Sequence, residues 1–139
     1  KIKTDKVVYL SDYAHHPEEI KQSILSVRAL YQDKKLTAVF QPHLYTRTRD
    51  FYQEFADSLS LLDEVILTDI YPARELPIEG VSSQLIYDHL SPNVEKTLCK
   101  KEEVLELLKN KDIEVLITLG AGDIENYASQ ICEILNQQC

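Results

Sequence analysis

The chain has little of what several large protein classes require. It contains only three glycines and five prolines, so it has no low-complexity tract and no flexible linker. No apolar run approaches the roughly 20 residues that a membrane-spanning helix needs. Lys and Arg number 15 against 23 Asp and Glu, which gives a net charge of −8. Because binding to phosphate backbones needs clustered basic side chains, we expect neither a nucleic acid nor a membrane as partner.

Several catalytic and metal-binding motifs are also missing. The three cysteines are widely spaced and include no C-x-x-C pair, which argues against a zinc site or a disulfide framework and favours reduced, cytoplasmic thiols. No G-x-x-x-x-G-K-[ST] string provides a Walker-type phosphate cradle, and no G-x-S-x-G string provides a nucleophile elbow. The chain starts at Lys1 without an initiator Met or a signal peptide, so we expect a fragment of a longer protein.

Apolar segments that suit strands alternate along the chain with segments of helical period. The expected strands are Val7–Leu10, Leu36–Phe40, Val65–Ile70, Val94–Cys99 and Ile113–Leu119. The expected helices carry apolar residues within Ile20–Tyr31, Phe51–Leu59, Leu85–Leu90, Val104–Leu108 and Ile124–Leu135. This alternation predicts one α/β domain over residues 1–139, with a mostly parallel sheet of about six strands and helices on both faces. We expect Lys1–Lys3 to add one antiparallel edge strand.

Polar segments follow the expected strands where ligands bind in open α/β sheets, beyond the carboxyl ends of the strands. These segments are SDYAHHP, QPHLYTRTR, TDIYPARELPIEG and LGAGD. The first contains Asp12, Tyr13, His15 and His16, which can bind a ligand or transfer protons. An ordinary helix start with exposed histidines fits the same string. A metal site is disfavoured, because adjacent histidines point in different directions and no third ligand is suitably spaced.

The second segment places basic side chains at the start of a helix. Pro42 ends the strand, and His43, Tyr45, Arg47 and Arg49 follow, near a helix N-terminus that favours anions. Either arginine can hold a carboxylate with two hydrogen bonds, although a capped helix start with surface arginines fits equally well. The LGAGD segment is only G-x-G, which is an incomplete dinucleotide fingerprint and favours a tight turn with Asp123 as the helix N-cap.

Four strings together resemble a known family. In chain order they are SDYAHHPEEI, FQPHLYTRTRDFYQEFADSL, VILTDIYPARELPIEGVSS and LITLGAGDI. They resemble the C-terminal domain of the Mur ligases, whose usual strings are similar to D-D-Y-G-H-H-P and F-Q-P-H-R-Y-T-R-T. The resemblance covers essentially the whole chain, from about Lys6 to Leu135. It implies a Rossmann-like, three-layer domain.

The resemblance also implies an activity that needs more than this domain. Mur ligases combine an N-terminal domain for the UDP-sugar, a central ATPase domain and a C-terminal domain that closes over ATP and receives the amino acid. FQPHLYTRT resembles best the branch that joins L-alanine to UDP-N-acetylmuramate in peptidoglycan synthesis, through an acyl phosphate. The implied partners are therefore ATP, L-alanine, UDP-N-acetylmuramate and the chain's own N-terminal and central domains. Mg²⁺ would be held mainly by the central domain, and this chain alone would be inactive.

Individual roles follow from the matched positions. By resemblance, Asp12 would contact the ATP ribose, while Tyr13, His15, His43 and Arg47 would line the L-alanine site. Arg47 would pair with the carboxylate of the amino acid, and a neutral His15 would assist catalysis by helping to keep its amine unprotonated.

Three positions depart from the family pattern. Ser11 replaces the first acid of the D-D pair, and Ala14 replaces a glycine, which makes a positive φ there unexpected. Leu44 stands where many relatives have Arg, which removes one candidate partner for a carboxylate and leaves Arg47 as the main one.

Two other functions remain open. Ala14 also fits a Mur ligase that recycles murein tripeptide, and competition between tripeptide and L-alanine in the full-length enzyme would separate the two. A stand-alone nucleotide- or protein-binding module is the third hypothesis. It would be favoured if the reading frame upstream of Lys1 contained no G-K-[ST] P-loop.

Overall fold

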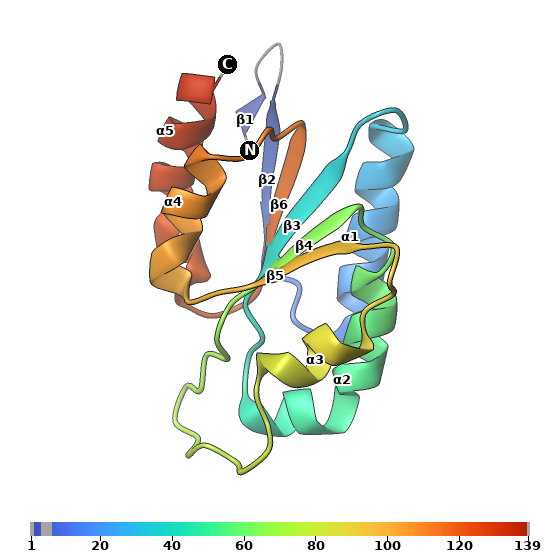
Figure 1. Cartoon of the computed structure of the whole chain (residues 1–139), viewed down its shortest axis with the longest axis vertical. Helices are drawn as coiled ribbons and strands as arrows, with labels where there is room; N and C mark the ends of the chain where they lie inside the picture. Colours follow the sequence, from blue (N-terminus) through green and yellow to red (C-terminus); the bar gives the residue numbers. More distant parts are fainter. Residues whose placement is uncertain (1, 4–6, 139) are drawn as a thin grey trace.

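A central sheet lies between two layers of helices in the computed structural model of this chain (Figure 1). The structure describes residues 2–3 and 7–138, and for 2–3 and 136–138 it describes only the backbone. The strands are β1 (Ile2–Lys3), β2 (Val8–Asp12), β3 (Leu36–Phe40), β4 (Glu64–Leu67), β5 (Glu95–Leu98) and β6 (Val115–Leu119). The helices are α1 (Pro17–Leu30), α2 (Tyr45–Leu59), α3 (Ser83–His89), α4 (Val104–Lys109) and α5 (Ala128–Gln138), with 3-10 turns η1 (Lys101–Glu103) and η2 (Asp123–Tyr127).

The sheet has the strand order β1-β2-β6-β3-β4-β5. All strands from β2 to β5 in this order pair in parallel, so their carboxyl ends meet at one edge, the lower edge in Figure 1. β1 pairs antiparallel with β2 through Ile2 and Lys3 alone. The body of the sheet is therefore five parallel strands, and β1 adds a two-residue antiparallel pairing at its edge. The antiparallel edge strand expected at Lys1–Lys3 is described at Ile2 and Lys3, and Lys1 lies outside the described part of the chain.

The α/β, Rossmann-like class predicted from the sequence is confirmed, and the central strands are buried on both faces. Every residue of β3 and of β6 is buried. Helices α1, α2 and α3 cover one face, where Ile24, Phe55 and Ile86 pack on strand residues such as Phe40. Helices α4 and α5 cover the other face, on which Leu116 meets residues of both helices. Pro17 occupies the first turn of α1, as its fixed φ favours.

Helix α2 differs from the expected apolar repeat. It begins at Tyr45, before the apolar residues start, and Phe51 is not part of its buried face. Phe51 has non-helical dihedrals (φ −130°, ψ 16°) and is 39% exposed, so the helix is kinked there. The spacing of Phe51, Phe55 and Leu59 alone could not show this, because a kink rotates the first part of the helix relative to the second.

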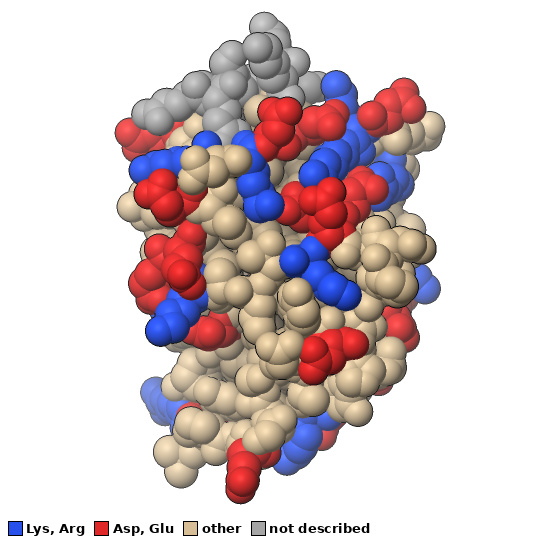
Figure 2. Space-filling view, viewed as in Figure 1, with Lys and Arg blue, Asp and Glu red and all other residues tan. Residues whose placement is uncertain are grey.

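Charged side chains of both signs are interspersed over the face of the molecule shown in Figure 2. The basic groups among the described residues of this face form no continuous patch, in line with the overall charge of −8. None of the helices within residues 7–138 is long and apolar enough to cross a membrane.

Candidate functional site

The loops that follow β2, β3 and β4 meet beyond the carboxyl edge of the sheet. His15, after β2, and His43, after β3, have ring centroids 6.0 Å apart in an edge-to-face arrangement. His43 forms a parallel β-bridge with Tyr71, in the loop after β4, and its ring stacks on that of Tyr71 at 5.6 Å. The parallel sheet thus brings polar segments that are far apart in sequence to one rim, as the positions of the strand ends predicted.

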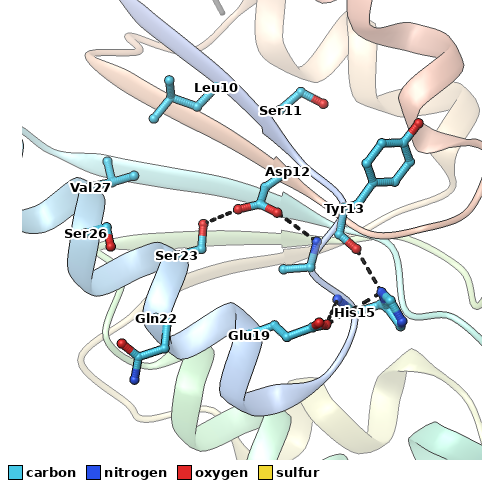
Figure 3. Close-up of a pocket in the computed structure, with 11 residues that line it drawn as sticks. Leu10, Ser11, Asp12, Tyr13, His15, Glu19, Gln22, Ser23, Ser26 and Val27 are labelled. Atoms are coloured by element: carbon cyan, nitrogen blue, oxygen red, sulfur yellow. Dashed lines mark hydrogen bonds and ion pairs between the residues drawn. The ribbon is translucent and has the colours of Figure 1, made fainter.

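Asp12 ends β2 and faces the side of α1. Its Oδ1 accepts a hydrogen bond from the backbone N–H of Ala14 (2.9 Å), and its Oδ2 accepts one from the Ser23 hydroxyl (2.7 Å). Figure 3 shows the carboxylate between these two groups. Asp12 lines a cleft of about 600 Å³ between β2 and α1. The side chain is exposed and each oxygen retains an unused lone pair. Asp12 can therefore still accept hydrogen bonds from the hydroxyls of a ribose, and the residues fit this part of a nucleotide.

His15 lines the same cleft and has a defined tautomer. Its Nδ1 lies 2.9 Å from the carbonyl oxygen of Tyr13. Because a carbonyl only accepts, Nδ1 carries the proton, and Nε2 is the acceptor of the neutral ring. Glu19 stabilises this turn by accepting from the backbone N–H groups of His15 (3.2 Å) and His16 (3.1 Å), which lower the pKa of Glu19. The hydrogen bond from Nδ1 thus fixes the orientation of the His15 ring and leaves Nε2 facing the rim.

His43 and Arg47 form a pair with the opposite tautomer. Nη1 of Arg47 lies 3.2 Å from Nδ1 of His43 and 3.4 Å from its carbonyl oxygen. A guanidinium only donates, so Nδ1 of His43 is unprotonated and Nε2 carries the proton of the neutral ring. Burial lowers the pKa of His43, and the positive charge of Arg47 lowers it further. His43 is therefore held neutral, as a hydrogen-bond acceptor for Arg47.

Arg47 is half-buried and has no acidic partner. Among the described residues, no carboxylate lies within 4.0 Å of its guanidinium, whereas Arg49 pairs with Asp50 at 2.9 Å. A guanidinium has five N–H donors, so most of those of Arg47 remain available after its contacts with His43. Of the two arginines singled out in the sequence, Arg47 is the one that can receive an external carboxylate at this rim.

Tyr13 lines the same cleft as Asp12 and His15, but its phenol group points away from them. Its hydroxyl donates a hydrogen bond to Glu125 of η2, which is the main reason that the pKa of Tyr13 is raised. The ring is 60% exposed, and in Figure 3 it points away from Asp12 and His15. The structure therefore brings Asp12, His15, His43 and Arg47 to one rim. Asp12, Tyr13 and His15 line a shared cleft there, but the Tyr13 hydroxyl is turned toward Glu125.

Gln41 supports the rim, and no role was assigned to it from the sequence. It is 1% exposed, its Nε2 donates to Asp123 (2.6 Å), and its Oε1 accepts from the N–H of Ile124 (2.9 Å). The LGAGD segment is a tight turn, as predicted, and a Cβ on Gly122 would lie 2.5 Å from Oε1 of Gln41. Asp123 is not the N-cap: Gly122 is, and the Asp123 side chain instead bonds Gln41 and Lys101. The sequence signal that could have indicated a structural role for Gln41 is its place as a polar residue between an apolar strand and Pro42.

Glu75, in the loop after β4, was also missed. Its carboxylate accepts hydrogen bonds from the first turn of α2, directly before Arg47. As for a metal, the described residues include no group of three or more His, Cys, Asp or Glu side chains that could hold one.

Comparisons with known proteins identify the family of this chain. Residues 1–124 match the family described as "Mur ligase, glutamate ligase domain". The UDP-N-acetylmuramate–L-alanine ligase of Phocaeicola vulgatus is 79% identical over 138 residues, which are 99% of this chain and 30% of that protein. The protein of the same name from Parabacteroides distasonis is 58% identical over 99% of this chain and 29% of its own length. This chain thus spans about 30% of the length of the curated relatives it matches.

A solved structure shows the same fold. The crystal structure of a UDP-N-acetylmuramate–alanine ligase from Thermotoga maritima matches this chain with a TM-score of 0.74 at 26% identity. The match covers 96% of this chain and 27% of that protein.

Proposed function

This chain belongs to the Mur ligase family, and we propose that it is the C-terminal, amino-acid-binding domain of a longer, cytoplasmic enzyme of peptidoglycan synthesis. That enzyme would join L-alanine to UDP-N-acetylmuramate, and ATP with Mg²⁺ would activate the muramyl carboxylate as an acyl phosphate. The 79% identity to a ligase of that name supports this choice of substrate. The P-loop and the sites for Mg²⁺ and the UDP-sugar would lie in the N-terminal and central domains, so this chain alone would not ligate.

The observation that carries the proposal is the state of Arg47. It is half-buried beside a neutral His43, at the edge where ligands bind in this fold class, and it has no carboxylate partner among the described residues. A guanidinium in this situation can take up the carboxylate of a small amino acid with two hydrogen bonds.

The other rim residues have complementary tasks in this proposal. His15 presents Nε2 as a proton acceptor, which would favour the neutral, nucleophilic form of the incoming amine. Asp12 would accept hydrogen bonds from the ATP ribose with the lone pairs that Ala14 and Ser23 leave free. Tyr13 remains a predicted member of the amino-acid site, and its hydroxyl would have to leave Glu125 to reach it.

A competition assay with the full-length enzyme tests the proposal. We expect ATP-dependent ligation of L-alanine to UDP-N-acetylmuramate, no product from the 139-residue chain alone, and L-alanine outcompeting murein tripeptide. Preference for the tripeptide would assign the protein to the recycling branch. Ligation by the isolated chain would contradict the division of labour between the domains.

A further inference from the structure

The first turn of α2 has no cap of its own. Leu44 occupies the N-cap position, where its side chain makes no capping hydrogen bond. Its φ is 77° with ψ 136°, in a region that residues with a side chain rarely adopt. Such a conformation persists only when the surroundings hold it, and it occurs most often at functional sites. Something outside the helix must therefore stabilise the turn that leads to Arg47.

The Glu75 carboxylate provides that stabilisation from 30 residues away in sequence. Its Oε1 accepts from the backbone N–H groups of Tyr45 (2.6 Å) and Thr46 (3.1 Å), and its Oε2 accepts from the Thr46 hydroxyl. The hydrogen bond from the Thr46 hydroxyl is the main reason that the pKa of Glu75 is lowered. A negative charge at this end of a helix also complements its dipole. Glu75 thus performs the task of an N-cap residue in place of Leu44.

The backbone of the same loop fixes the other side of the strained residue. Leu44 N–H donates to the carbonyl of Tyr71 (2.9 Å), and Tyr71 N–H donates to the carbonyl of Pro42 (2.8 Å). Glu75 itself is placed by a turn in which its N–H donates to the carbonyl of Pro72 (2.9 Å). The segment from Tyr71 to Glu75 therefore holds the chain on both sides of Leu44. It bonds Pro42 before Leu44, and Tyr45 and Thr46 after it.

We propose that Glu75 is a positioning residue for amino-acid binding: by holding Tyr45 and Thr46 it aims Arg47 at the carboxylate of the incoming amino acid. This rests on the function proposed for Arg47. Glu75 acts through the backbone immediately before Arg47 and does not itself touch the amino acid. Its effect is therefore on the affinity for the amino acid and not on ATP or on the chemical step.

Kinetics of the full-length enzyme test this role. Glu75→Ala should raise KM for L-alanine roughly 3- to 30-fold, the range that loss of a helix cap corresponds to, with kcat and KM for ATP within about twofold of wild type. Glu75→Gln should have a smaller effect, because its amide oxygen still accepts from the two backbone N–H groups. The matched control is Glu79→Gln, which changes an exposed glutamate of the same loop and should leave all constants unchanged. An unchanged KM for L-alanine in Glu75→Ala overturns the proposal.

A double variant separates positioning from general stability. If Glu75 acts through Arg47, Glu75→Ala should raise KM little further in an Arg47→Ala background, because the group being aimed is already gone. If the effects of the two substitutions on KM for L-alanine were fully additive, Glu75 would have a merely structural role. The same would follow if Glu75→Ala impaired kcat, KM for L-alanine and KM for ATP equally.

Amide hydrogen exchange in the same enzymes tests the capping contacts of Glu75 without any substrate. The N–H groups of Tyr45 and Thr46 should exchange faster in Glu75→Ala and not in Glu79→Gln. If the wild-type enzyme prefers another amino acid, the proposed function fails, and the same KM comparison is made with that amino acid. Faster exchange with an unchanged KM for the preferred amino acid overturns the positioning role alone.

Discussion

Arg47 donates a hydrogen bond to the ring of His43, four residues earlier and just before α2, with 3.2 Å between Nη1 and Nδ1. The bond fixes one end of the guanidinium and requires the imidazole to be neutral. Burial and the charge of Arg47 both favour that neutral state by lowering the pKa of His43. The His43 ring therefore orients the Arg47 guanidinium, and substitution of either residue tests this arrangement.

Replacing Arg47 by Ala should weaken amino-acid binding selectively. Loss of a charged, two-point contact costs about 2–4 kcal/mol, so KM for L-alanine should rise at least tenfold in the full-length enzyme, with KM for ATP little changed. Steady-state kinetics at saturating ATP measure this. Arg49→Ala is the control, because Arg49 already pairs with Asp50 and is exposed. An unchanged KM in Arg47→Ala would show that its guanidinium does not bind the amino acid.

The stability of this chain should depend on pH through His43. Its pKa is lowered in the fold, so the unfolded chain binds the proton more tightly, and protonation favours unfolding. The stabilising contribution should be complete above about pH 6.5, the unfolded value, and be lost as the pH falls through the lower folded value. An imidazole NMR titration should give a midpoint below that of a free histidine. The free energy of unfolding, relative to His43→Gln, should fall between pH 7 and pH 5, and a flat or rising difference would contradict the assignment.

Asp12→Asn should impair the use of ATP. The amide keeps the shape of the carboxylate. Its oxygen can still accept from the Ala14 N–H, and its nitrogen can donate to the Ser23 hydroxyl, so the fold of this turn should be preserved. The lost charge and acceptor should raise KM for ATP at least tenfold, in keeping with about 1.5–3 kcal/mol for a hydrogen bond to a charged group. Asp57→Asn, on the exposed side of α2, is the control. A defect confined to L-alanine would mean that Asp12 serves the amino acid instead.

The layers of the fold could be predicted because they depend on local patterns. The buried strands β3 and β6 are short, continuous apolar runs, and α1 presents Ile20, Ile24 and Val27 at helical spacing to one face. Parallel strands then oblige the following loops to share one rim, which is why Asp12, His15, His43 and Arg47 could be grouped from sequence.

The contacts that hold the rim could not be predicted in this way. Gln41 bonds Asp123 across 82 residues, and Glu75 caps a helix that starts 30 residues earlier, so neither pairing leaves a periodic signal in the sequence. The direction of the Tyr13 ring depends on Glu125, which only the folded chain brings near. In the sequence Leu44 is an ordinary apolar residue, and its positive φ is held by hydrogen bonds to the loop from Tyr71 to Glu75.

Glu64 offers a test of the opposite, amino-terminal end of the sheet. Its side chain is 3% exposed, and its carboxylate bonds Lys111 (2.6 Å) and lies 3.4 Å from Lys35. Burial alone would raise the pKa of Glu64, but the two lysines outweigh it and hold the pKa below its usual value. Glu64→Gln should therefore destabilise this chain by about 1–3 kcal/mol at pH 7, measured by urea unfolding.

The pH dependence distinguishes this charge effect from a packing defect. Because the folded pKa of Glu64 is lowered, its contribution is complete above about pH 4.5 and is lost as the pH falls through the folded value. Wild type and Glu64→Gln should then become equally stable in acid, whereas a packing defect would persist at every pH. The control is Glu95→Gln: Glu95 is 67% exposed and lies 3.5 Å from the same Lys35, so its loss should change stability by less than about 0.5 kcal/mol. A larger effect at Glu95 than at Glu64 would show that burial does not decide the strength of this ion pair.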